Sequence, residues 1–195
     1  MKENLQAISD LQKKAWDTVS KGWKKWNDFT MNFLTPMGEA IIKALDIKSN
    51  DVVLDIASGT GEPALSIAAI AENGQVYATD LSEEMLSIAR TYADERNISN
   101  IEFKAANVSD LPFTNNFFDK ISCRMGFMFF PDMQLAANEM FRVCKMGVKL
   151  LYVFGLHRKK MIGQLRSQKL YQNILKCQRH QPMHLECFDV QSPGL

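Results

Sequence analysis

The 195-residue chain has no apolar run long enough to cross a membrane, and we expect no targeting leader in it. The longest apolar stretch of its C-terminal half, residues 148–156, is interrupted by Lys149 and falls far short of the ~20 residues that a spanning helix needs. The N-terminus lacks the apolar segment of a secretory signal, and its lysines are mixed with acidic residues, unlike those of a transit peptide. We therefore expect no membrane span and a cytoplasmic location.

Cysteine and histidine are also scarce, with four and three residues. The four cysteines show no disulfide-framework spacing, so reduced thiols are expected. Cys177, His180, His184 and Cys187 could supply four zinc ligands, but known zinc fingers separate their two ligand pairs by ~12 residues or more, and here the pairs nearly touch. Pro182 also interrupts a helical pairing of the histidines. No metal site is predicted.

The net charge of +1 is unevenly distributed. Residues 157–195 hold seven Lys or Arg against two acids, while the rest of the chain is net negative. No aromatic interleaving or nucleic-acid motif accompanies this basic tail. We interpret it as a solvated segment and predict no nucleic-acid partner.

A glycine-rich turn follows the apolar run 52–56 and precedes a helix start. Gly59 and Gly61 permit positive φ and a close ligand approach, and Pro63 suits a first helical turn. Such a loop, between a strand and a helix, is typical of nucleotide-class ligand sites. Pro63 and the glycines therefore mark the candidate site.

Two ligand classes compete for this loop. Gly59-x-Gly61-x-x-Ala64 loosely fits the pattern for a pyridine dinucleotide. Asp55, at the end of the strand, would repel pyrophosphate and attract a cation, which favours S-adenosylmethionine with its ammonium and sulfonium. Asp80 ends the next apolar run, 25 residues after Asp55, near the ~20 typical of ribose-binding acids.

Strand and helix patterns alternate along the chain after an amphipathic opening segment. Helical spacing is seen over 5–30, before Thr35-Pro36, and again around 41–45. Strands are then expected near 52–56, 75–79, 101–104, 118–122 and 149–154, and helices near 62–71, 83–96 and 133–144. This alternation predicts an α/β fold with a mostly parallel sheet that is covered on both faces.

Four motifs resemble, in the right order, those of class I S-adenosylmethionine-dependent methyltransferases. The resemblance covers about residues 15–156 and is closest to the methyltransferases of ubiquinone and menaquinone biosynthesis. The motifs are VLDIASGTG (53–61), ATDLSEEML (78–86), ANVSDLPF (106–113) and FDKISCRMG (118–126). The resemblance implies a Rossmann-like three-layer αβα sandwich, with S-adenosylmethionine as cofactor and a small-molecule acceptor.

The same resemblance implies roles for individual residues. The loop from Ala57 to Gly61 would lie along the methionine part of the cofactor, and Asp80 would take the ribose hydroxyls. The family usually has Asp where this chain has Asn107, whose amide oxygen can still accept from adenine. The segment at Arg124 would close the site, and the alternative for Arg124 is a surface ion pair. The predicted cofactor residues are Asp55, Ala57, Ser58, Gly59, Gly61, Asp80, Leu81, Met85, Asn107, Val108 and Arg124.

The predicted reaction is methyl transfer to a small molecule by in-line displacement, which depends mainly on positioning. No catalytic base is identified, since the neighbours of His157 suggest a surface turn. Two alternatives remain at this stage. One is an inactive cofactor-binding fragment or pairing module, and the other is a nicotinamide-dependent oxidoreductase.

Three regions are expected: a helical cap or lid (1–46), the cofactor-binding core (47–156) and the basic tail (157–195). Trp16, Trp23, Trp26 and Phe29 in the cap fit either core packing or a lid over the cofactor. The tail shows no convincing pair of strands, and its segment 161–177 resembles a helix. We therefore expect a shortened product, incomplete after its fifth strand, whose exposed sheet edge favours a homodimer unless the tail covers it.

Overall fold

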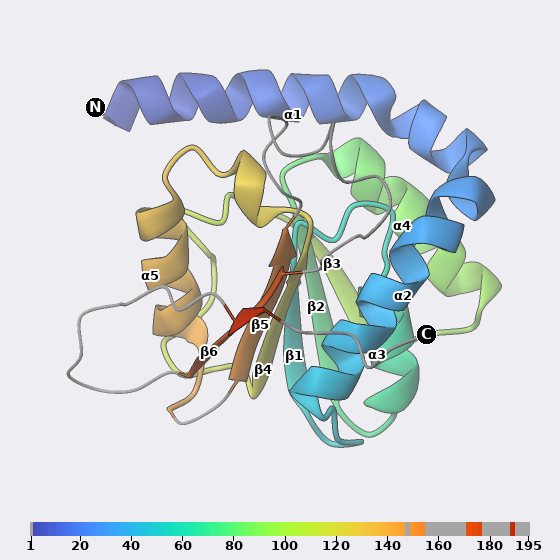
Figure 1. The fold of residues 1–195 in the computed structure, drawn as a ribbon. Helices are drawn as coiled ribbons and strands as arrows, with labels where there is room; N and C mark the ends of the chain where they lie inside the picture. Colours follow the sequence, from blue (N-terminus) through green and yellow to red (C-terminus); the bar gives the residue numbers. More distant parts are fainter. Residues whose placement is uncertain (1, 147–148, 155–170, 177–187, 190–195) are drawn as a thin grey trace.

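The computed structural model describes residues 2–146, 149–154, 171–176 and 188–189 (Figure 1). Two long helices come first, and strands and helices then alternate. The elements are α1 (Lys2–Lys25), α2 (Asn27–Leu45), β1 (Val52–Ile56), α3 (Ala64–Ile70), β2 (Gln75–Asp80), α4 (Glu83–Glu95), β3 (Ile101–Ala105), β4 (Lys120–Arg124), the 3₁₀ turn η1 (Phe127–Phe129), α5 (Met133–Val143), β5 (Lys149–Phe154), β6 (Tyr171–Lys176) and β7 (Phe188–Asp189).

The strands of the described residues form one sheet in the order β3-β2-β1-β4-β5-β6-β7. The first five strands are parallel, and β6 and β7 are antiparallel to their neighbours. The order reverses between β1 and β4, which is where open α/β sheets bind ligands. The predicted Rossmann-like αβα sandwich with a mostly parallel sheet is confirmed.

The sequence interpretation was wrong about the edge of this sheet. The helix expected over 161–177 is, in its described part Tyr171–Lys176, the strand β6. β6 pairs with all six residues of β5, so β5 has a neighbour on each side and is not an exposed edge. Pairing satisfies the backbone groups of β5, and this tertiary demand outweighed the local helical pattern. The remainder of the expected basic tail lies outside the described residues.

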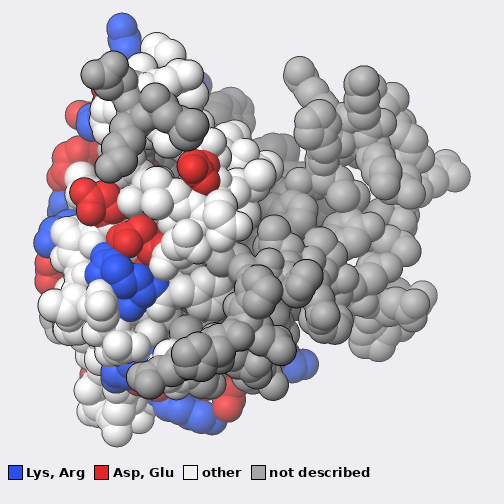
Figure 2. Space-filling model, turned by 90° about the vertical axis from the view of Figure 1, so that its left-hand side faces the viewer, with Lys and Arg blue, Asp and Glu red and all other residues white. Residues whose placement is uncertain are grey.

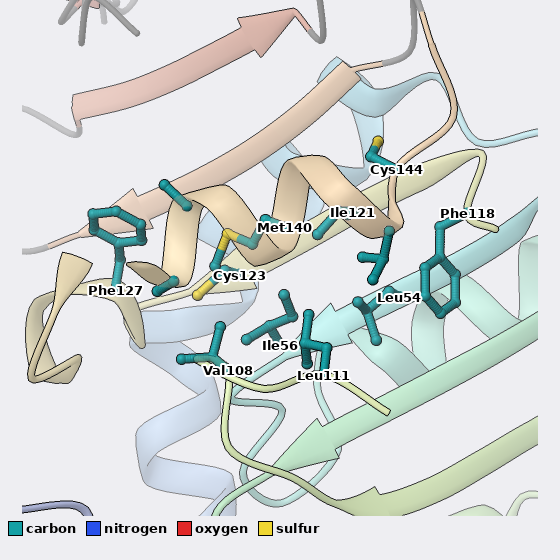
Figure 3. Close-up of a cluster of buried hydrophobic side chains, with 13 residues drawn as sticks. Leu54, Ile56, Val108, Leu111, Phe118, Ile121, Cys123, Phe127, Met140 and Cys144 are labelled. Atoms are coloured by element: carbon teal, nitrogen blue, oxygen red, sulfur yellow. The ribbon is translucent and has the colours of Figure 1, made fainter. Parts of the chain in front are cut away.

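Alternating side chains of the central strands supply a core on each face of the sheet. Val53 packs with α2 and α3 on one face. Leu54 and Ile56 of β1 join Ile121 of β4 on the other face, beneath Met140 of α5 (Figure 3). The two cores hold the strands firmly, so the loops at their carboxyl ends have a rigid base.

The opening helices differ from the sequence prediction at Pro36. The predicted break at Thr35-Pro36 does not occur, because α2 continues through the proline to Leu45. The helix packs on the sheet through Ile41 and Leu45, which are fully buried. This burial offsets the hydrogen bond that proline cannot donate. α1 then lies across the carboxyl edge of the sheet (Figure 1).

On the face seen in Figure 2, lysines and arginines of the described residues are interspersed with acidic side chains. No extended patch of a single sign is visible there. Within the described ranges, no helix combines the length and hydropathy that a membrane crossing requires. The Cys177–Cys187 segment with its two histidines lies outside them, as does His157.

Candidate functional site

A cavity of about 260 Å³ lies where the carboxyl ends of the central strands meet α1. The loops after β1, β2, β3 and β4 form its floor and sides, and α1 covers it. Nine of the eleven predicted cofactor residues line it: Ala57, Ser58, Gly59, Asp80, Leu81, Met85, Asn107, Val108 and Arg124. The fold therefore gathers residues from four separate motifs around one space.

The loop after β1 has a left-handed backbone at Ala57, Gly59 and Gly61. Positive φ costs little at glycine but is strained at Ala57, and such strain tends to occur at functional sites. The Ser58 N–H donates to Thr79 O at 3.0 Å, which ties the loop to β2. Gly61 lies outside the cavity lining. A Cβ there would be 2.9 Å from Leu65 Cδ1, so this glycine permits close packing of the loop on α3.

Asp80 connects the ends of β1 and β2. Its Oδ2 accepts the N–H of Gly59 at 2.9 Å, and its Oδ1 accepts the N–H of Ser82 at 2.8 Å. Burial raises the pKa of Asp80, while these backbone donors oppose the rise. Each carboxylate oxygen has a further lone pair, so the side chain can accept from a diol in the cavity. Asp80 thus orders the loop and faces the ligand space.

Asp55 lies behind the cavity lining and is fully buried. Its Oδ1 accepts from Ser122 Oγ at 2.5 Å, whereas its Oδ2 has no hydrogen-bond partner, nor has the buried Ser58 Oγ. Burial raises the pKa of Asp55 to about 7, although Ser122 and Arg124 oppose the shift. Two unpaired buried oxygens beside the loop suit a ligand that carries positive charge and N–H donors.

Arg124 at the end of β4 supplies the cation of the site. Its Nη1 donates to Leu34 O of α2 at 3.1 Å. Burial lowers the pKa of Arg124, and Asp55 and Glu62 oppose this. The guanidinium has further donors that can meet a carboxylate in the cavity. Glu62 is engaged on both sides, by Arg96 at 2.5 Å and by Ser66 Oγ at 2.7 Å.

The loop after β3 is linked to α1. Asn107 Oδ1 accepts the N–H of Ser109 at 3.0 Å, and its Nδ2 donates to Ser9 Oγ at 3.2 Å. Ser9 Oγ already donates to Leu5 O at 3.0 Å, so it meets Asn107 as an acceptor and the link uses the N–H donor of the amide. Met85 and Val108 are buried alongside and present apolar surface to the cavity.

Sequence reasoning missed the polar residues through which α1 meets the strand-end loops. Besides Ser9, Gln12 Nε2 donates to Phe129 O at 2.5 Å, and Asp17 accepts from Ser82 Oγ at 2.6 Å. These three residues occur at spacings of three and five along α1. This spacing places the three residues near one face of the helix, which was a weak signal of a shared role. Nothing in the sequence identified their distant partners.

The aromatic residues of the opening helices separate into two sets. Trp16 and Trp23 line the cavity, and Trp16 meets Phe129 edge-on at 5.1 Å between ring centroids. Trp26 and Phe29 do not line it and are each 59% exposed. The core-packing interpretation is therefore wrong for Trp26 and Phe29, while Trp16 and Trp23 lie where the lid interpretation needs them.

Ionisable groups are few in this cavity. Among the lining residues that the structure describes, only Glu62, Asp80 and Arg124 can carry charge. Each of them already makes a hydrogen bond or ion pair to the protein. Burial also raises the pKa of the nearby Cys123 thiol, which disfavours its thiolate. The arrangement suits binding and positioning more than proton abstraction.

Comparison with known proteins gives a consistent result. Residues 8–176 match the model of the ubiE/COQ5 methyltransferase family. A demethylmenaquinone methyltransferase from Bacillus mycoides is 30% identical over 131 residues, which are 67% of this chain and 55% of the relative. The chain spans about half the length of the curated relatives it matches.

Solved structures agree with the family match. The YcgJ protein from Bacillus subtilis is 28% identical with a TM-score of 0.59, covering 64% of this chain and 53% of that one. A SAM-dependent methyltransferase from Aquifex aeolicus is 25% identical with a TM-score of 0.57, covering 63% and 67%. Since the family model matches well over half of the chain, the chain belongs to the ubiE/COQ5 methyltransferase family, for which S-adenosylmethionine is the expected cofactor.

Proposed function

We propose that the protein transfers a methyl group from S-adenosylmethionine to a small-molecule acceptor in the cavity under α1. The observation that carries the proposal is the position of Asp80, which faces the cavity with spare lone pairs while its backbone contacts hold the glycine loop in place. Family membership supports the same conclusion.

The residues present fit this cofactor. Asp80 would hold the ribose hydroxyls, and Leu81 and Met85 would pack against adenine. Arg124 would meet the cofactor carboxylate, and the unpaired Ser58 Oγ could accept an N–H from the cofactor. Asp55, behind the lining, would favour the positive charge of the cofactor without touching it. When bound, S-adenosylmethionine supplies a methyl group activated by its sulfonium.

The protein itself contributes positioning and exclusion of water. Trp16 and Phe129 close the cavity on the side of α1, and Leu34 and Met125 add apolar surface. In-line transfer gains most from such restraint of donor and acceptor. Because the described lining residues include no free base, we expect an acceptor whose own chemistry makes its carbon, oxygen or nitrogen nucleophilic.

The start of α3 argues against the nicotinamide alternative. The Leu65 N–H donates to Gly61 O, the Ser66 N–H donates to the Glu62 carboxylate, and Pro63 has no N–H. A dinucleotide site needs free donors at this helix end for pyrophosphate. The carboxylate already present there favours a cation.

Calorimetric titration with S-adenosylmethionine tests the cofactor assignment. Asp80→Asn keeps the size of the side chain but removes its charge and one acceptor, so binding should weaken at least tenfold, or about 1.4 kcal/mol. Asp94→Asn is the matched control, because Asp94 is exposed on α4, and it should bind like the parent chain. Equal affinity in all three proteins would contradict the assignment, and tighter binding of NADH would favour the oxidoreductase.

Methyl transfer to a panel of small acceptors separates an enzyme from an inactive cofactor-binding fragment. Release of S-adenosylhomocysteine that depends on an acceptor supports the proposed activity. If the cofactor binds and no acceptor is methylated, the binding module is the better conclusion.

A further inference from the structure

α1 and α2 meet at a corner of the molecule (Figure 1). Exposed aromatic side chains lie at this corner and do not line the cavity. Trp26, Phe29 and Phe33 are 59%, 59% and 57% exposed, and none of them lines the cavity. Their rings form a row, with centroids 6.5 Å apart from Trp26 to Phe29 and 5.2 Å apart from Phe29 to Phe33. Contiguous exposed apolar surface of this kind marks an interaction site.

Basic side chains accompany this aromatic row. Lys21, Lys24 and Lys25 are exposed in the last turns of α1, and Lys25 Nζ lies 5.4 Å from the centroid of the Trp26 ring. Asp28 is the single acid between residues 19 and 33. The segment that carries the aromatic row, residues 19–33, therefore has three lysines against one acid and is net positive.

We propose that this aromatic row and its lysines dock the protein on an anionic lipid surface. Indole and phenyl rings enter the boundary between headgroups and acyl chains, while neighbouring lysines attract anionic headgroups. The proposal needs no assumption about methyl transfer.

A lipid surface fits this patch better than a second copy of the chain. Three rings that are little more than half exposed offer on the order of 400 Å² of apolar area. Each partner of a stable dimer contributes about 800 Å². Two such lysine-flanked patches would also repel each other. A bilayer requires no matching surface and has the complementary charge.

Docking would bring the cavity close to the bilayer. Trp23 lines both the cavity and the shallow groove formed by Val19, Gly22, Trp26, Phe29 and Thr30. Among the described residues, Trp23 is the one that lines both spaces. The surface and the site are thus neighbours, although their residues differ.

Flotation with lipid vesicles tests the proposal on the whole chain. The protein should float with vesicles of phosphatidylcholine and phosphatidylglycerol at seven to three, and it should float much less with phosphatidylcholine alone or at high salt. The double variant Phe29→Ser/Phe33→Ser should partition at least tenfold more weakly. Lys24→Gln and Lys25→Gln should each weaken partition about fivefold.

Met133→Ser on α5 is the matched control, since Met133 is 54% exposed on another surface. It should float like the parent, and circular dichroism and calorimetry with S-adenosylmethionine should show that all variants remain folded. Quenching of Trp26 by brominated lipid, lost in Trp26→Phe, would support insertion at this corner. Flotation unchanged by the Phe29/Phe33 variant overturns the proposal, as does failure of the folded parent to float. A dimer that the Phe29/Phe33 variant abolishes would instead assign the patch to a second copy.

Discussion

The two sides of the cavity are built in different ways. On the sheet side, the ligand loops are held at the ends of adjacent strands. The Ser58 N–H donates to the backbone carbonyl of Thr79, and the Gly59 N–H donates to the Asp80 carboxylate. On the side of α1, three side-chain contacts and one ring pair span the gap. The sheet side is therefore rigid by construction. α1, which covers the cavity, is held by a few side chains that single substitutions could remove. Such attachment suits an element that must move to admit ligands.

The largest expected effect lies on the sheet side, at the buried Asp55. Its pKa of about 7 in the folded protein exceeds the ordinary value of 3.8. Between pH 4 and 7 the unfolded chain releases this proton while the folded chain keeps it, so the free energy of unfolding falls as pH rises through this window. The full shift corresponds to about 4 kcal/mol as an upper bound.

Asp55→Asn should remove this dependence. Differential scanning calorimetry would measure the thermal midpoints of Asp55→Asn and the parent at two pH values. The midpoint of the variant minus that of the parent should be larger at pH 8 than at pH 5. The same variant should bind S-adenosylmethionine more weakly at pH 8, because it loses a buried negative charge just behind the cavity lining that attracts the cationic cofactor through space. Asp94→Asn controls for loss of an acid at the surface. Identical pH profiles for the parent and Asp55→Asn would show that Asp55 does not titrate in this range.

The next largest effect is expected at Gly126, where the loops after β1 and β4 touch. A Cβ at this position would be 2.4 Å from Ala57 Cβ and 3.0 Å from Cys123 Sγ. Gly126→Ala should therefore lower the free energy of unfolding by about 2 kcal/mol and disturb the strained Ala57. Urea unfolding measures the change.

Gly22→Ala makes the same chemical change within α1, where a Cβ would meet nothing within 4 Å. This control should stabilise the protein by about 0.5–1 kcal/mol through helix propensity. If both alanines have the same effect, contact between the two loops does not limit stability.

The difference between the two sides also explains what the sequence could reveal. Gly59, Asp80 and the strand pattern around them are local signals, and they led to the correct sheet and to residues that line one cavity. The partners of Ser9 and Gln12 lie 98 and 117 residues away, and no local rule predicts such pairs. The strand β6 was missed for a related reason, since its state depends on the unpaired side of β5 and not on its own helical spacing. The predicted cofactor residues that line the cavity come from four separate motifs, which supports their proposed roles in binding. The titrations with S-adenosylmethionine would test those roles.

The smallest effect is expected at Asp17 on α1, the helix that covers the cavity. Its Oδ1 accepts from Ser82 Oγ at 2.6 Å, while its Oδ2 pairs with Lys13 on the same helix. Burial raises the pKa of Asp17, but the hydrogen bonds from Lys13 and Ser82 outweigh this and lower it, so the contact is made by the charged form. Asp17→Ala should speed the release of S-adenosylmethionine about fivefold, since one such hydrogen bond contributes about 1 kcal/mol.

Stopped-flow fluorescence of the Trp16 and Trp23 indoles would follow this release. Asp10→Ala is the matched control, because Asp10 is exposed on the same helix and its side chain accepts from Gln6 at 2.9 Å within that helix. Faster release in Asp17→Ala alone would show that α1 retains the cofactor through its contact with the β2 loop. If Asp10→Ala has the same effect, α1 acts through its helical stability. The contrast between a rigid sheet side and a helix held by individual side-chain contacts would then no longer hold.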